Sequence, residues 1–599
     1  MEKEISKIPQ TEDDIIPTLK LSYDHLPSSL KQCFVYYSLF PKDYVLNVEI
    51  LAQHWMAQGF IKIPYPNDCL EDVGYQYFKE LLWRSFFEEV EIDEKGTVTK
   101  CKMHDLMHEL AESITRPEFD RRNGNTEPFN SKTRHVLLYG YHSYLVQEML
   151  PSLIQAKKMR MIPRPDVPGQ RLLLTRIVDE STCDAVALNL TSLRMLDLHE
   201  YSIMKVPKSI GKLKHLRYLD LSYNGFKVLP DCVTRLHNLL TLTLNKCVFL
   251  QVLPKNINKL IKLRNLEIGE CYNLKYMPRG IGELSSLCKL SKFTLNKDMS
   301  FSSKHQGGAA LDELGGLNNL RGTLKIEHLR IDAIFVRPKD ANLKEKQHLR
   351  SLDLSWIEDV KLEEIIEAVP EGYEMQLEGL QPHPNLKDLC IRKYQGVRFP
   401  SWFDSLTNLY VLNDEYLSYS SSSSSTLIVF PSLEVLCLDN LPNLKGWWGR
   451  SDSSSATASS THDDHRLPVF PNCLSRLTIY NCPSLTCMPL FAYVNHRVES
   501  RNTSWKSFQQ TILSVSGGGA RPINVQPSSS STSSSTSSYY SPLCKLTSLV
   551  IHWIHDLQFL PDELKSLTSL KDLNIGYCQK FKSLYPGIQY LTITSIFMD

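Results

Sequence analysis

The sequence lacks a strong net charge, a long apolar run and any CxxC pair, and each absence excludes a class of protein. Among 599 residues, 67 are basic and 66 are acidic, which leaves a formal charge of +1. This balance provides no general attraction to nucleic acid or to anionic membranes. No run of about 18 apolar residues occurs, so we expect no transmembrane helix and no stable membrane insertion. The N-terminal segment MEKEISKIPQ lacks the apolar core and cleavage site of a signal peptide.

Cysteine is present but does not form the pattern of a disulfide framework. The 15 cysteines are an odd number, scattered along the chain and often set inside apolar patterns. This usage is typical of buried thiols in a reducing compartment. We therefore expect a cytoplasmic protein whose thiols are unpaired.

A leucine pattern repeats from about residue 190 onward. The motif LxxLxL, in some copies with Ile at the end, begins at Leu193, Leu216, Leu239, Leu263, Leu349, Leu386, Leu433, Leu474, Leu546 and Leu570. An aliphatic-proline pair keeps the same spacing, as at Val206-Pro207 and Leu229-Pro230. The alternating leucines predict a short strand with one buried face, and the proline ends the strand and turns the chain. One such unit cannot bury its apolar face alone, so we expect the units to stack into a parallel sheet.

One slot, three residues after the last aliphatic of the strand, carries a small polar or thiol side chain. It holds Asn224, Cys247, Cys271, Cys482 and Cys578. We expect these side chains to point inward and to bind backbone groups at the turn. Buried thiols in apolar surroundings are usually inert, which favours a structural role for these cysteines over a metal or redox role.

The repeat pattern becomes irregular after about residue 295. Serine-rich tracts interrupt it at 418–426, 451–461 and 528–541, and because such polar tracts cannot bury enough surface to fold, we expect loops there. We assign a linker and the first irregular repeats to 116–185 and the leucine-rich-repeat domain to 186–599. The last residues, SIFMD, do not form an obvious polar capping repeat, so we expect a truncated C-terminus.

The first 115 residues carry helical patterns instead. They predict helices over 26–40, 48–61 and 69–85, a β-hairpin around Glu94-Lys95-Gly96, and a helix over 103–114. Pro27 suits the first turn of its helix. This order is typical of a winged helix, which we assign to 1–115. The predicted fold class is α+β: a winged-helix domain followed by a curved leucine-rich-repeat solenoid with parallel strands on its concave face.

A winged helix often binds DNA, but the charges here disfavour that function. Binding to a duplex requires Lys or Arg against the phosphates. Residues 48–58 contain neither, and 69–85 contains Lys79 and Arg84 against three acidic residues. We therefore expect no nucleic-acid partner.

Two sequences could bind a metal. His104 and His108 stand at i and i+4 in a predicted helix, as in the HExxH motif of zinc proteases. However, Asp105 is a poor substitute for the glutamate base, and a catalytic zinc site needs a third protein ligand. His462-Asp463-Asp464-His465 lies in a serine-rich tract, which does not preorganise ligands. We expect no metal site and no enzymatic activity.

The predicted strands carry two columns of charge. The residue after the leading leucine is basic at Arg194, Arg217, Arg264, Arg350, Lys387 and Lys571, and a residue near the strand end is acidic at Asp197, Asp220, Glu267 and Asp353. One interpretation is charge pairing across strands, which aids solubility. The other is a docking surface for a nucleotide-binding module or an effector. Exposed aromatic residues are candidate anchors of such a surface, namely Tyr218, Trp356 and Tyr480.

Three segments together resemble a known family. They are LKLSYDHLPSSLKQCFVYYSLFPKDYVL (19–46), HWMAQGFI (54–61) and KMHDLMHELA (102–111), followed by the repeats. The chain resembles the plant intracellular nucleotide-binding leucine-rich-repeat (NB-ARC-LRR) disease-resistance proteins of the coiled-coil subtype. These motifs occur in the order that the family uses.

The resemblance implies a receptor of innate immunity that switches between ADP and ATP states. By resemblance, His104 contacts the ADP phosphate, and Met103 and Asp105 hold it in place. The repeats would recognise a pathogen effector or a guarded host protein and restrain the switch. The chemistry is reasonable because an imidazole can donate a hydrogen bond to a phosphate oxygen.

The sequence departs from the family in having no GxxxxGK[ST] phosphate loop. We expect it to be the C-terminal part of such a receptor, which binds ADP or ATP only when a nucleotide-binding module is supplied in cis or in trans. The alternative is a leucine-rich-repeat scaffold that binds proteins without signalling. A scaffold has no reason to keep Met103-His104-Asp105 joined to a winged helix.

Overall fold

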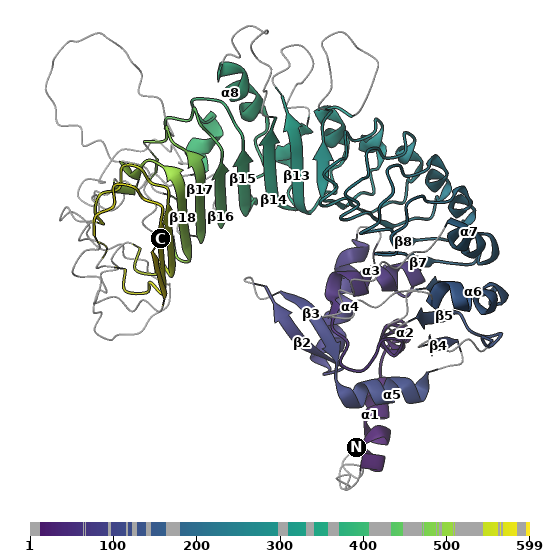
Figure 1. The fold of residues 1–599 in the computed structure, drawn as a ribbon. Helices are drawn as coiled ribbons and strands as arrows, with labels where there is room; N and C mark the ends of the chain where they lie inside the picture. Colours follow the sequence, from purple (N-terminus) through teal and green to yellow (C-terminus); the bar gives the residue numbers. More distant parts are fainter. Residues whose placement is uncertain are drawn as a thin grey trace, which may run out of the picture. The chain divides into compact units, whose positions relative to one another are not determined.

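The protein is described from a computed structural model, drawn as a ribbon in Figure 1. The structure describes residues 12–63, 65, 68–93, 97–115, 118–122, 128–138, 145–162, 180–296, 309–330, 341–357, 370–406, 433–446, 470, 473–486, 488–489, 494–506, 508–509, 543–560, 564, 567–583 and 595–598. The chain forms two compact units, Met1–Ser291 and Lys292–Asp599. Among the described residues, no helix combines the length and the apolar character that crossing a membrane requires.

The first unit begins with the winged helix. Its elements are α1 (Glu12–Asp24), α2 (Ser28–Tyr37), β1 (Leu46–Asn47), α3 (Val48–Gln58), α4 (Leu70–Trp83), β2 (Phe87–Ile92), β3 (Val98–Met103) and α5 (Asp105–Ile114). The three strands form an antiparallel sheet in the order β1-β3-β2. The predicted order of three helices, a hairpin and a helix is confirmed, and α1 is an additional helix that the sequence did not predict.

Single residues set the ends of the winged-helix elements. The side chain of Asn47 caps α3 by accepting hydrogen bonds from the backbone N–H groups of Glu49 and Ile50, at 2.9 and 3.1 Å. Gly59 ends the same helix in the left-handed conformation, with φ of 78°. Pro27 occupies the N-cap of α2, immediately before the first turn where we expected it.

Eight parallel strands follow in the first unit, in the order β11-β10-β9-β8-β7-β6-β5-β4. Their bounds are β4 (Phe119–Arg122), β5 (His135–Leu138), β6 (Met161–Ile162), β7 (Met195–Asp197), β8 (Tyr218–Asp220), β9 (Thr241–Thr243), β10 (Asn265–Glu267) and β11 (Lys289–Leu290). The helices between them are α6 (Leu145–Gln155), α7 (Glu180–Asn189) and the 3-10 helices η1 (Lys208–Lys212), η2 (Asp231–Arg235), η3 (Ile257–Lys259) and η4 (Ile281–Glu283). Three of the strands, β4 to β6, lie in the segment 116–185, so the sheet begins directly after the winged helix.

The repeated leucines form the core of this sheet. Leu219, Leu242 and Leu266 lie in register on β8, β9 and β10, and none has exposed surface. Burial of each such side chain contributes about 1.5–3 kcal/mol. The predicted stacking of repeats into a parallel sheet is therefore confirmed.

The side chains in the slot after each strand point inward and bind backbone groups, as predicted. The thiols of Cys247 and Cys271 donate to the backbone oxygens of Leu221 and Leu244, both at 3.1 Å. Asn224 occupies the same slot and donates to backbone carbonyl groups from a buried position. Burial raises the pKa of the Cys247 thiol to about 12, which keeps it protonated. These side chains satisfy backbone groups at the turn.

The residue just before that slot adopts a left-handed backbone in successive repeats. The φ angle is 58° at Tyr223, 57° at Lys246 and 54° at Glu270. Only a minority of residues other than glycine adopt this conformation. It turns the side chain away from the core, as the 48% exposure of Tyr223 illustrates.

Ten parallel strands form the second unit, in the order β12 to β21. They are β12 (Lys292–Thr294), β13 (Gly322–Leu329), β14 (Leu349–Trp356), β15 (Asp388–Arg392), β16 (Val435–Asp439), β17 (Arg476–Cys482), β18 (Arg497–Thr503), β19 (Ser548–His552), β20 (Asp572–Gly576) and β21 (Ser595–Met598), accompanied by α8 (Pro370–Gly379), η5 (Leu311–Gly316), η7 (Leu343–Glu345) and η8 (Ser401–Leu406). The widely spaced copies that begin at Leu349 and Leu386 supply adjacent strands, β14 and β15. The serine-rich tracts predicted as loops lie outside the described residues.

Candidate functional site

The Met-His-Asp sequence lies where the hairpin of the winged helix meets its last helix. Met103 ends β3 and is buried. His104 caps α5, because its Nδ1 accepts a hydrogen bond from the backbone N–H of Leu106 at 3.3 Å. Asp105 begins α5 and lies 3.5 Å from the ammonium group of Lys42. The core thus anchors Met103, while the helix cap orients the imidazole of His104 at the surface.

This cap leaves one polar atom of His104 available. Since Nδ1 accepts a hydrogen bond, the neutral ring carries its proton on Nε2. That Nε2 lies 3.9 Å from the carboxylate of Glu88, and 47% of the His104 side chain is exposed. A phosphate oxygen could accept a hydrogen bond from it. Because the sequence has no phosphate loop, the residues present could supply one contact to ADP but not the cradle around its phosphates.

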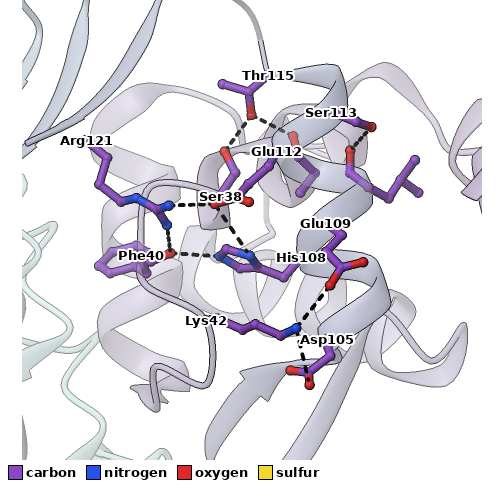
Figure 2. A network of polar contacts seen from close by, with 12 residues as sticks. Ser38, Phe40, Lys42, Asp105, His108, Glu109, Glu112, Ser113, Thr115 and Arg121 are labelled. Atoms are coloured by element: carbon purple, nitrogen blue, oxygen red, sulfur yellow. Dashed lines mark hydrogen bonds and ion pairs between the residues drawn. The ribbon is translucent and has the colours of Figure 1, made fainter.

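A polar network ties α5 to the first repeat strand (Figure 2). His108 is buried, and its Nε2 lies 2.8 Å from the backbone oxygen of Phe40. Arg121 of β4 donates to the same oxygen at 3.3 Å and pairs with Glu112 of α5 at 2.7 Å. The imidazole of His108 therefore holds α5 in place against the turn after α2.

The zinc hypothesis gains no support from this geometry. In the part of the chain that the structure describes, His104 and His108 do not belong to any group of side chains able to share a metal. The ring of His108 already contacts the backbone oxygen of Phe40. The sequence 462–465 lies outside the described residues.

Two arginines, one directly before β7 and one directly before β8, contact the C-terminus of α3. The Nη1 of Arg194 donates to the backbone oxygen of Gln58 at 2.6 Å. Arg217 packs so closely on Gly59 that a Cβ there would lie 2.9 Å from its Nη1. Cations at a helix C-terminus complement its dipole. Burial, together with the charges of Arg160 and Arg217, lowers the pKa of Arg194 to about 10.

Two ion pairs contact the N-termini of α3 and α4. Arg264 binds Glu71 through two hydrogen bonds, Nε to Oε1 at 2.8 Å and Nη2 to Oε2 at 2.7 Å. Each of these two side chains is 19% exposed. The Nζ of Lys289 lies 2.7 Å from Glu49 and 3.1 Å from Glu267. A bidentate arginine-carboxylate pair is among the strongest polar contacts in proteins, so Arg264 is the main polar anchor of this surface.

Tyr218 is buried, so the prediction of an exposed aromatic anchor is wrong at this position. Its ring packs edge-on against His54 of α3, with the centroids 5.1 Å apart. The hydroxyl of Tyr36 lies 3.1 Å from Nδ1 of His54. Tyr218 and Met195 belong to the same apolar cluster as the helices of the winged helix. The winged helix and the repeats therefore share one core. We use the name winged-helix contact for this shared core together with the polar contacts made by Arg194, Arg217, Arg264 and Lys289.

The remaining predicted residues lie in the second unit. Trp356 is buried, and its Nε1 donates to Oε1 of Gln376 at 2.8 Å, so it is not the exposed anchor that we predicted. Arg350 is exposed. Tyr480 is partly buried, and its hydroxyl donates to Glu499 at 2.7 Å.

The contacts of the charge columns differ between the two units. In the second unit, Asp353 of the acidic column pairs across strands with Arg392, which lies outside the basic column and also reaches Asp439, at 3.1 and 2.8 Å. In the first unit the basic column docks a partner, as Arg194 and Arg264 show. That partner is the winged helix of the same chain, which we had not considered.

Sequence reasoning missed the acidic residues of the winged-helix contact. Glu49 and Glu71 lie in the first turns of α3 and α4, where an acidic residue reads simply as a helix-start signal. Their pairing with Lys289 and Arg264 joins segments that are far apart in the sequence, and no local pattern encodes it.

Two family models match this chain. The model "Leucine-rich repeat region" matches residues 176–491, and the model "Disease resistance protein Winged helix domain" matches residues 39–111. Among solved structures, a leucine-rich-repeat protein of Leptospira interrogans is 16% identical and covers 76% of this chain and 87% of its own, with a TM-score of 0.38.

Similar curated proteins come from plants. Disease resistance protein RGA2 of Solanum bulbocastanum is 33% identical over 97% of this chain and 51% of its own length. The RPP13-like protein 1 of Arabidopsis thaliana is 30% identical over 96% of this chain and 56% of its own. A further disease-resistance protein of Arabidopsis thaliana is 39% identical over 79% of this chain and 34% of its own. The chain thus spans about a third to a half of these relatives, and it belongs to the plant disease-resistance protein family that joins a winged helix to a leucine-rich-repeat region.

Proposed function

We propose that this chain is the winged-helix and recognition part of a cytoplasmic receptor of innate immunity. Its repeats would recognise a pathogen effector or a guarded host protein and restrain an ADP/ATP switch. The winged-helix contact is the observation that carries this proposal. Recognition, rather than catalysis, is the activity that we assign to it.

The restraint follows from what the contact would cost to break. Movement of the winged helix away from the repeats separates Arg264 from Glu71 and exposes the shared core around Tyr218. Water would then solvate both charges, so most of the cost of opening comes from the apolar side chains of the shared core, at about 1.5–3 kcal/mol for each one that becomes fully exposed. A contact of this strength holds the winged helix in one position until a ligand or a neighbouring module favours another.

The nucleotide would be contacted through His104. A nucleotide-binding module, in cis or in trans, would supply the phosphate cradle, and His104 would add one hydrogen bond from Nε2. The cap at Leu106 and the exposure of the ring support this role. For the chain alone, we expect no stable binding of ADP or ATP.

Part of the recognition surface is proposed to lie on the second unit, around a hollow of 370 Å³ lined by Asp439, Tyr480, Asn481, Arg501, Asn502, Trp553 and His555. Trp553 has a left-handed backbone, with φ of 53°, and its ring stacks on Tyr577 at 4.9 Å. The two residues are 40% and 52% exposed. Exposed aromatic residues are common interface anchors. Hydroxyl-radical footprinting with a cognate effector should protect both rings, and unchanged labelling during tight binding would place recognition elsewhere.

The test of the receptor proposal is complementation. Co-expression of this chain with the nucleotide-binding fragment of a related receptor should give association and a regulated defence response. Asp105→Ala should make that response constitutive or abolish it, because it removes one of the two carboxylates that pair with Lys42, the one next to His104. The Lys42–Asp105 pair is about half exposed, so its loss should cost less than about 1 kcal/mol of stability. A large change in signalling would therefore report on the switch and not on folding.

The matched control is Asp231→Ala, which changes an exposed aspartate in the first turn of η2. It should leave both association and response unchanged. Failure of the two fragments to associate at all would favour the second candidate, a leucine-rich-repeat scaffold that binds proteins without signalling.

A further inference from the structure

Two cysteines from opposite sides of the winged-helix contact meet at Arg264. Cys69 is the N-cap residue of α4, and Cys288 immediately precedes β11. The Nη2 of Arg264 lies 3.2 Å from the sulfur of each. Both sulfurs and the carboxylate of Glu71 lie within 4.8 Å of one another. Two thiols thus approach each other across the surface that joins the winged helix to the repeats.

The surroundings of this pair favour one thiolate and one thiol. A hydrogen bond from Cys288 lowers the pKa of the Cys69 thiol to about 7, although burial and the charge of Glu71 raise it. The same hydrogen bond, together with burial, raises the pKa of Cys288. In its thiol form Cys69 donates to Oε2 of Glu71 at 2.7 Å. A cation next to a thiol stabilises the thiolate, which is the nucleophilic form.

The two cysteine residues differ in their exposure to solvent. Cys69 is only half buried, whereas Cys288 is 3% exposed. The slot cysteines Cys247 and Cys271 are fully buried, and each bonds to a backbone oxygen. A small oxidant can therefore reach Cys69 first, with Cys288 held behind it as the second thiol.

A metal ion fits this cluster less well than oxidation does. The two sulfurs and Glu71 surround a point that the guanidinium of Arg264 already approaches, at 3.2 Å from each sulfur and 2.7 Å from Oε2 of Glu71. A metal would have to displace this cation from its bidentate carboxylate.

We propose that Cys69 and Cys288 form an oxidisable pair that a hydroperoxide such as hydrogen peroxide converts into a disulfide between the winged helix and the repeat sheet. The Cys69 thiolate attacks one peroxide oxygen, the O–O bond breaks, and the products are a sulfenic acid and hydroxide, which takes up a proton. The sulfur of Cys288 then attacks the sulfenic sulfur, the S–O bond breaks, and the departing oxygen leaves as water with the thiol proton. In sum, two thiols lose two electrons and two protons, and one peroxide becomes two waters.

The disulfide would make the winged-helix contact covalent. In the reduced protein, the surface is held by ion pairs and packing, which open and close reversibly. In the oxidised protein, separation would require a reductant. This redox site does not depend on the identity of the recognised ligand or on nucleotide binding.

The test uses the purified full-length chain. Peroxide treatment, thiol blocking and trypsin digestion without reductant should yield a cross-link between peptides 63–79 and 280–289, which carry Cys69 and Cys288. Its mass should be two hydrogens below the sum of the two peptides, and dithiothreitol should release it. Before oxidation, iodoacetamide should modify Cys69 on the order of tenfold faster than Cys247, given the higher thiolate fraction of Cys69.

Variants keep the test specific. Cys288→Ser should abolish the cross-link and leave a sulfenic acid on Cys69 that a 1,3-dicarbonyl probe traps. Cys390 and Cys437 lie in register on β15 and β16, and the peptide assignment separates any linkage there from this one. Three results would overturn the proposal: no linkage of the two peptides in the wild-type chain, equal alkylation of Cys69 and Cys247, or protection of both thiols by stoichiometric zinc in place of cross-linking.

Discussion

Arg264→Glu is expected to release the winged helix from the repeats. The substitution places a new carboxylate against Glu71 in a site where each native side chain is 19% exposed. Burial by itself would raise the pKa of Glu71, but the hydrogen bonds and charge of Arg264 lower it overall, so the native carboxylate is ionised. Breaking such a buried pair costs about 3–5 kcal/mol. Hydrogen exchange in α4 should accelerate on the order of a hundredfold or more, since every 1.4 kcal/mol corresponds to a factor of ten.

Two further variants separate docking from a general loss of stability. Arg350→Glu changes an exposed arginine at the same position of another repeat, so exchange in α4 should stay as in the native chain. The double variant Arg264→Glu with Glu71→Arg exchanges the two charges and should re-form the ion pair in the opposite orientation. It should therefore restore much of the protection of α4 from hydrogen exchange. If Arg264→Glu left α4 fully protected, the ion pair would not be an anchor of the winged-helix contact.

Acidification is expected to weaken the same contact through two buried histidines. Burial lowers the pKa of His54 to about 4, against an opposing contribution from the charge of Asp197. Burial and the charges of Arg160 and Arg194 lower the pKa of His135 to about 3. Both folded-state values lie below 6.5, the ordinary value, so the unfolded chain binds more protons at acid pH. The contribution of the two neutral histidines to the free energy of unfolding is therefore fully present above pH 6.5, and it is lost as the pH falls toward 4.

One carboxylic acid opposes this trend. Burial and the charge of Asp197 raise the pKa of Asp220 to about 7. The folded chain therefore protonates Asp220 near neutrality, which relieves the cost of its buried charge as the pH falls from 7 toward 4. The gain from Asp220 offsets the loss from one of the two histidines. The free energy of unfolding should therefore fall by about 1.4 kcal/mol for each pH unit below 6.5.

Thermal unfolding of the full chain between pH 6.5 and 4.5 checks this prediction. The melting temperature of the first unit should fall with pH, and His54→Gln with His135→Gln should flatten or reverse the slope. His215→Gln, at an exposed histidine of the same unit, should leave the slope unchanged. If the melting temperature of the native chain rose as the pH was lowered from 6.5 to 4.5, the protonation of Asp220 would outweigh that of the histidines.

Local periodicity predicted the elements of this protein, because it reflects contacts within one repeat or one helix. The spacing of Leu219 and its equivalents predicted the buried strand face, and the slot at Cys247 was predicted with its inward orientation. The surroundings of Tyr218 and Trp356 could not be predicted in this way. Tyr218 is covered by α3, and Trp356 by Gln376 of α8, and both covering residues come from other parts of the chain.

Of the polar residues in the winged-helix contact, the sequence predicted the arginines on the repeats but not the acidic residues on the winged helix. The basic column was visible because Arg194, Arg217 and Arg264 recur with the repeat. Its partners Glu49 and Glu71 do not recur, and they oppose the column only once the two domains have packed together. The Met-His-Asp sequence was found by resemblance, and its role as a helix cap required the fold.

The left-handed residue before each slot carries a side chain that is not part of the buried core. At Tyr223, Lys246, Trp553 and Tyr577 the backbone takes the same conformation although the side chains differ completely. Exchanging one of these side chains leaves the leucines beneath it undisturbed, so the chain can acquire a new surface without rebuilding its interior. Under the proposed recognition function, we expect differences between alleles to concentrate at these positions.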